Sequence, residues 1–99
     1  MAYESPALDT ALAAAVGDDP ALVAELREAF LESARRHADA LLKAGNDADW
    51  RTAALRLQSI AASFGAMQLM VAASEAAAAP AGDRDALRLV GTAMAFCVG

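Results

Sequence analysis

The stretch AALRLQSIAASFGAMQL, residues 53–69, contains the pattern that decides the fold. Apolar residues recur every three or four positions through Leu57, Ala61 and Phe64, which is the period of one face of an α-helix. Gly65 interrupts this pattern, and a second apolar pattern follows it. The stretch therefore predicts two helices joined by a break of small residues.

Leu55 does not belong to this apolar face. It lies about 100° around the helix from its neighbours in sequence, so it is predicted to be substantially exposed beside Arg51 and Gln58. The residues predicted to form the core are Trp50, Leu57, Phe64, Phe30 and Leu26. An exposed leucine in the middle of a helix suggests a contact with another molecule.

Start and stop signals extend the helical prediction to the rest of the chain. Ser5-Pro6 and Asp19-Pro20 each combine a capping residue with a first-turn proline, so helices are predicted over about residues 6–16 and from residue 20 to a stop at Gly45. Asp49 is predicted to cap a third helix. A fourth is expected from Met67 to a stop before Pro80, and a fifth from a cap at Asp83 to Cys97.

These boundaries predict one all-α domain over residues 1–99. β-Branched and aromatic residues are scarce, which disfavours strands, and alanine and leucine are strong helix formers. Because the connections are only a few residues long, successive long helices should pack side by side in opposite directions. The expected fold is an antiparallel four-helix bundle with a short additional N-terminal helix.

Composition also disfavours several classes of function. A net charge of −5 opposes nucleic-acid binding, which needs a basic face. Cys97 is the single cysteine, so no disulfide can form within the chain. No apolar run approaches the roughly 20 residues of a membrane span. The first ten residues lack the basic and apolar segments of a signal peptide, so a cytoplasmic location is expected.

Three segments resemble the histidine-containing phosphotransfer (Hpt) domain of bacterial phosphorelays. GDDPALVAELREAFLESA is similar to the start of the family's long second helix, and NDADWRTAA to the turn and tryptophan that open its third. SIAASFGAMQL resembles the stretch that follows the phosphorylated histidine. Together the segments place the resemblance over about residues 8–79.

The motif of the family, Ala-His-x-Leu-Lys-Gly, corresponds to ALRLQS, residues 54–59. Leu55 stands at the position of the histidine, Gln58 at that of the lysine and Ser59 at that of the glycine. The resemblance implies that the histidine is the nucleophile and the lysine offsets the charge of the transferred phosphoryl group. Leu55 has no lone pair, so a degenerate Hpt domain without phosphotransfer at this position is predicted.

The docking surface of such a domain can persist without its nucleophile. Arginines on the second and third predicted helices form a locally basic patch around an apolar centre, which fits the carboxylates of a receiver domain. The predicted docking residues are Leu55, Arg51, Arg56, Gln58, Ser59, Arg35, Arg36 and His37. The alternative is that these arginines pair with Glu32 or Asp39, as surface arginines commonly do.

His37 is the only histidine in the chain. In a hairpin that turns near Asn46-Asp47, facing residues have numbers that sum to roughly 93–95, so His37 should lie near Leu55. It is interpreted as a structural residue at the bundle edge, with phosphorylation of His37 as the alternative. No metal-ligand spacing, cofactor motif or hydrolytic triad is recognisable, so no metal, no cofactor and no enzyme activity are predicted.

Three functions follow as hypotheses. The first is an inactive Hpt-like module that docks a response-regulator receiver domain or a histidine kinase and modulates a two-component phosphorelay. The second is a generic helical interaction or dimerisation domain, and the third is phosphotransfer through His37. A monomer or weak homodimer that binds neither nucleic acid nor membrane is expected.

Overall fold

A computed structural model describes residues 12, 14, 17 and 19–98 of the chain. Within these residues the chain forms four α-helices and no strand, as predicted. The helices are α2 (Pro20–Lys43), α3 (Asp47–Ser63), α4 (Met67–Ala77) and α5 (Arg84–Val98). The expected N-terminal helix over about residues 6–16 lies largely outside the described residues, although Leu12 is described and is buried against the core.

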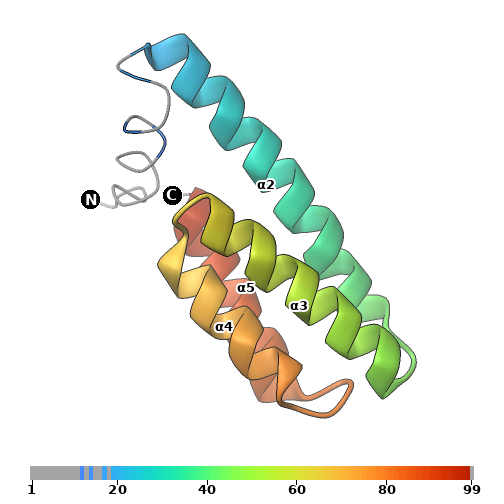
Figure 1. Cartoon of the computed structure of the whole chain (residues 1–99). Helices are drawn as coiled ribbons and strands as arrows, with labels where there is room; N and C mark the ends of the chain where they lie inside the picture. Colours follow the sequence, from blue (N-terminus) through green and yellow to red (C-terminus); the bar gives the residue numbers. More distant parts are fainter. Residues whose placement is uncertain (1–11, 13, 15–16, 18, 99) are drawn as a thin grey trace.

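The helices form one bundle. α3 packs against both α2 and α4, while α5 packs against α4 and, less extensively, against α2. Figure 1 shows that the first turns of α2 extend beyond the other three helices and that the short connections return the chain alongside the preceding helix. Both α2 and α3 are therefore accessible on the side away from α5.

Helix α2 begins as the sequence predicts. The Asp19 carboxylate accepts hydrogen bonds from the backbone N–H groups of Ala21 and Leu22 at 3.0 and 3.3 Å, and Pro20 occupies the first turn. These bonds satisfy amide groups that have no partner within the helix. The helix ends at Lys43, two residues before the predicted stop at Gly45.

The start of α3 corrects one prediction. Asn46, not Asp49, is the N-cap, and its side-chain oxygen accepts a hydrogen bond from the Asp49 N–H at 2.8 Å. Its amide group donates in return to the Asp49 carboxylate at 3.1 Å. Asp49 therefore lies in the first turn as the reciprocal partner of the cap, and a capping asparagine with an acidic residue three positions later was the signal for this start.

Gly65 ends α3 as predicted. Its φ of 74° lies in the left-handed region that favours glycine. The Gly65 N–H donates to the Ala62 carbonyl at 3.2 Å, and the Ala66 N–H donates to the Ala61 carbonyl at 2.9 Å. These two bonds form a Schellman motif, which satisfies carbonyls at the end of α3 and turns the chain into α4.

The core holds α3 against its neighbours. Trp50 is buried, and its indole Nε1–H donates to the Ala76 carbonyl at 2.7 Å, which joins the start of α3 to the end of α4. At the other end of α3, the Phe64 ring packs on Phe30 with ring centroids 5.1 Å apart. Phe30, Trp50 and Leu57 are buried as predicted, whereas Phe64 and Leu26 are only partly buried.

Helix α5 begins at the predicted cap. The Asp83 carboxylate accepts hydrogen bonds from the N–H groups of Asp85 and Ala86 at 2.9 and 3.3 Å. Asp47 of α3 accepts a hydrogen bond from the Ala81 N–H at 2.9 Å, so it fixes the connection between α4 and α5. No helix among the described residues is long and apolar enough to cross a membrane.

Candidate functional site

Leu55 lies on the exposed face of α3. It is 41% exposed, while Ala53, Ala54 and Leu57 around it in sequence are buried. The prediction that Leu55 lies off the apolar face of this helix is therefore confirmed. Its exposure follows from helical geometry, because the buried residues occupy the opposite side of α3.

A groove runs beside Leu55, between α2 and α3. We call it the α2–α3 groove. It is lined by His37 of α2, by Thr52, Leu55, Arg56, Ser59, Ile60 and Ser63 of α3, and by Phe64. Leu55 contributes an apolar wall to the groove, and the hydroxyl groups of three residues at helical spacing border it.

The structure brings His37 into this groove together with Leu55 and Arg56, in agreement with the register expected for a hairpin that turns near residue 46. His37 is half-buried at the edge of α2. Burial lowers the pKa of His37 below its ordinary value of about 6.5, and the positive charges of Arg36 and Arg56 lower this pKa further. The imidazole is therefore uncharged at neutral pH.

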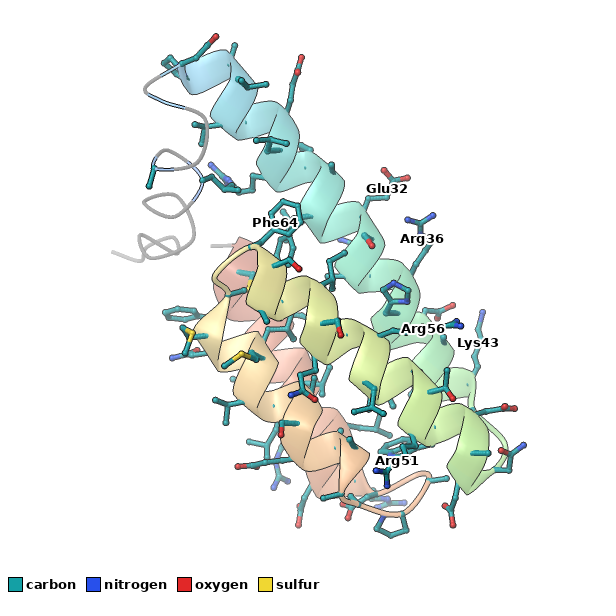
Figure 2. The ribbon with its side chains drawn as sticks, viewed as in Figure 1. Glu32, Arg36, Lys43, Arg51, Arg56 and Phe64 are labelled. Carbon is teal, nitrogen blue, oxygen red and sulfur yellow. The ribbon has the colours of Figure 1, made fainter. Side chains whose placement is uncertain are left out.

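The cationic groups around the groove come from both helices. Figure 2 shows Arg36 projecting from α2 and Arg56 lying between α3 and α2, with Arg51 nearer the start of α3. All three residues are exposed. Arg56 thus lines the groove, while Arg36 and Arg51 are exposed elsewhere on α2 and α3.

The alternative of local ion pairing does not account for these arginines. Asp39 pairs with Lys43 at 2.9 Å rather than with an arginine. Within the part of the chain that the structure describes, no ion pair joins Glu32 or another carboxylate to Arg36, Arg51 or Arg56. Their guanidinium groups are available to carboxylates of another molecule.

Four predicted docking residues lie outside the groove lining: Arg35, Arg36, Arg51 and Gln58. Arg35 is separated from His37 by about 200° around α2, and it borders hollows formed with Glu28 and Glu32 and with residues of α5. Gln58 is half-buried, and Arg51 is exposed one turn before Leu55. The structure therefore does not bring Arg35 to the α2–α3 groove, because adjacent residues on a helix point in different directions.

Four residues of the groove were not predicted as docking residues from the sequence: Thr52, Ile60, Ser63 and Phe64. Thr52 precedes Leu55 by three residues, Ser59 follows Leu55 by four, and Ser63 follows Ser59 by four. Their spacing of three or four residues along the face that contains Leu55 is the signal that could have identified them.

The groove combines apolar, hydroxyl and cationic side chains. Leu55 offers only carbon, and the charges that act on His37 come from Arg36 and Arg56, not from a carboxylate that could orient or activate an imidazole. Among the described residues, no group of three or more His, Cys, Asp or Glu side chains could hold a metal ion. Cys97 is buried, and burial raises the pKa of its thiol, so it is protonated at neutral pH.

Comparisons with known proteins find no family, no curated protein and no solved structure that matches this chain.

Proposed function

We propose that the protein is an inactive Hpt-like signalling module of the cytoplasm, an antiparallel four-helix bundle with a short N-terminal helix. It docks a response-regulator receiver domain or a histidine kinase through the α2–α3 groove and modulates a phosphorelay without carrying phosphate. One observation carries the proposal: Leu55 is 41% exposed in a groove that it lines together with Arg56 and His37, on a chain of net charge −5.

The groove suits a partner surface that has carboxylates around a recess. Receiver domains present such a cluster of carboxylates, and the arginines would attract it over a distance and fix its orientation. Leu55 would then enter the recess as an apolar anchor at the position where an Hpt domain has its imidazole. The uncharged His37 borders the same contact.

Phosphate transfer is not part of the proposal. Leu55 cannot attack phosphorus, and Gln58 brings no positive charge to the site of the family's lysine. To test the third hypothesis, we would incubate the protein with radiolabelled, phosphorylated kinases and receivers. The expected result is no acid-labile label, whereas a label that disappears in His37→Ala would contradict the proposal.

Binding of the partner is tested with the purified chain on a biosensor surface. Receiver domains and histidine kinases of the same organism would be passed over it at two salt concentrations. At least one should bind, with an association rate that falls at high salt and falls further in Arg56→Glu.

Arg84→Glu is the matched control, because Arg84 is an exposed arginine on α5, away from the groove. It changes the net charge by the same amount as Arg56→Glu and should affect binding much less. Absence of binding by every receiver and kinase would refute the proposal, and so would an equal loss in both variants.

The second hypothesis, a helical dimerisation domain, is favoured by a separate observation. Apolar side chains are exposed on α4 and α5, on a different face from the α2–α3 groove. This face and the proposed docking function are compatible within one protein.

A further inference from the structure

Large apolar side chains gather on the face formed by α4 and α5. Met67 is 58% exposed, Val71 50%, Leu89 43% and Phe96 44%. Together they are four of the seven exposed large hydrophobic residues among the described part of the chain. Such clustering differs from the scattered single exposures that are normal on protein surfaces.

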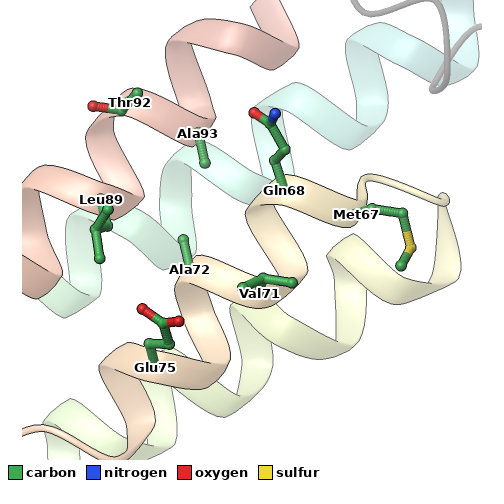
Figure 3. A pocket seen from close by; sticks show the side chains of 8 residues that line it. All are labelled: Met67, Gln68, Val71, Ala72, Glu75, Leu89, Thr92 and Ala93. Atoms are coloured by element: carbon green, nitrogen blue, oxygen red, sulfur yellow. The ribbon is translucent and has the colours of Figure 1, made fainter.

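The face also contains a hollow. Figure 3 shows the small side chains of Ala72 and Ala93 between the two helices, with Val71 and Leu89 beside them. Both alanines are buried, at 6% and 4% exposure, whereas the side chains on either side of them protrude. The same face therefore carries both a recess and the projections that would fill one.

Charge is absent from most of this face. Residues 67–74 of α4 and residues 89–98 of α5 include no Asp, Glu, Lys or Arg. The α2–α3 groove, by contrast, is lined in part by Arg56. An uncharged apolar face does not attract a charged partner, but it can pack against an identical uncharged apolar face on a second copy of the chain.

We propose that the α4–α5 face is the interface of a homodimer, in which a second copy of this chain docks around a two-fold axis. In such an interface the same patch serves both partners, so it must hold projections and recesses together. Val71 and Leu89 of one copy would fill the hollow over Ala72 and Ala93 of the other.

The positions of the carboxylates determine the orientation of the two copies. Glu75 lines one end of the hollow, and Met67 lines the other. A two-fold axis perpendicular to α4 and near Ala72 places the two Glu75 side chains at opposite ends of the interface. The opposite orientation would bring these like charges together, which is unfavourable.

The available area suits a reversible dimer. With side chains of about 150–200 Å² that are each roughly half exposed, the four apolar residues present on the order of 350 Å² per copy. Two copies and a surrounding rim reach about 1,000 Å², which is near the lower limit for a specific interface. We therefore expect a dissociation constant of the dimer in about the micromolar range.

Sedimentation velocity of the full chain tests this interface. Between low and high micromolar concentration, the mass should rise from 10.1 kDa toward twice that value. Val71→Arg should remain at the monomer mass, because it places a charge at the centre of the contact. Leu42→Arg is the control, since Leu42 is 64% exposed on α2 beside a different hollow, and it should dimerise like the wild type.

A cross-link provides a second measurement that does not depend on a disruptive variant. Thr92 is exposed at the edge of the hollow near the proposed axis, so Thr92→Cys should form a disulfide-linked dimer on mild oxidation. Ala40→Cys, on the exposed face of α2, should not.

Several outcomes would overturn the dimer. One is a wild type that stays monomeric at every concentration. Another is equal cross-linking of the two cysteine variants. A monomeric wild type whose melting temperature falls in Val71→Arg would mean that residues of the same chain cover this face. Binding of a receiver or kinase is a separate readout, because it depends on Leu55 and not on Val71.

Discussion

The variant Leu55→Ala tests whether Leu55 is a docking residue or a core residue. Leu55→Ala removes three carbon atoms from a side chain that is 41% exposed. The exposed part amounts to about 75 Å², and at about 25 cal/mol per Å² its burial by a partner contributes roughly 1–2 kcal/mol. The affinity for a receiver or kinase should therefore fall about 5- to 30-fold.

The same change should have little effect on folding. Because Leu55 lies outside the core, Leu55→Ala should lower the free energy of unfolding by no more than about 0.5 kcal/mol. That corresponds to a decrease in melting temperature of no more than about 2–4 °C for a domain of this size. Leu57→Ala is the matched comparison, since Leu57 is fully buried and its truncation should cost about 2–5 kcal/mol.

The assay pairs thermal unfolding by circular dichroism with the affinity measured on the biosensor. Leu55→Ala should change the affinity strongly and the melting temperature only slightly. A decrease in melting temperature as large as that of Leu57→Ala, with unchanged affinity, would show that Leu55 stabilises the fold and does not contact a partner.

Three other changes test the groove and the packing. Because the pKa of His37 is lower in the folded protein than in the unfolded chain, the unfolded chain takes up the proton first as pH falls below about 6.5. In urea unfolding, the free energy of unfolding of the wild type should therefore fall more between pH 7.5 and 5.5 than that of His37→Gln. Equal decreases would contradict the lowered pKa of His37, which is caused first by burial and then by Arg36 and Arg56. Trp50→Phe removes the Nε1–H bond to the Ala76 carbonyl and leaves that carbonyl without this donor, so the urea midpoint should fall by the equivalent of about 1–3 kcal/mol. Gly91→Ala should raise the free energy of unfolding by about 0.5–1 kcal/mol, because Gly91 lies within α5 and an added methyl group meets open space; a loss of stability in thermal unfolding would show a contact at this position.

Local signals in the sequence were sufficient to predict the positions of the helices that the structure describes. Asp19-Pro20, Gly65 and Asp83 act through hydrogen bonds and backbone angles that involve only a few neighbouring residues. The same kind of local chemistry explains the one misplaced cap, because Asn46 and Asp49 form a reciprocal pair and either could have been read as the cap. Burial of Trp50 and exposure of Leu55 followed from the helical period alone.

The surfaces depended on how the helices pack. Arg35 and His37 are two residues apart in α2, and only the packing of the helices decides that His37 shares a groove with Arg56 of α3 while Arg35 borders α5. The hollow over Ala72 and Ala93 likewise exists because α5 returns alongside α4, and neither helix alone contains it.

The sequence by itself determined that this chain is helical, where its helices begin and end, and that Leu55 lies off the buried face, because each of these depends on interactions within a few residues. Only the tertiary structure decided which arginines share a groove with Leu55 and which apolar side chains remain exposed together on α4 and α5, because these depend on side chains from different helices. Distances between helices are set by the packing of the whole core, and no local pattern in the sequence contains them.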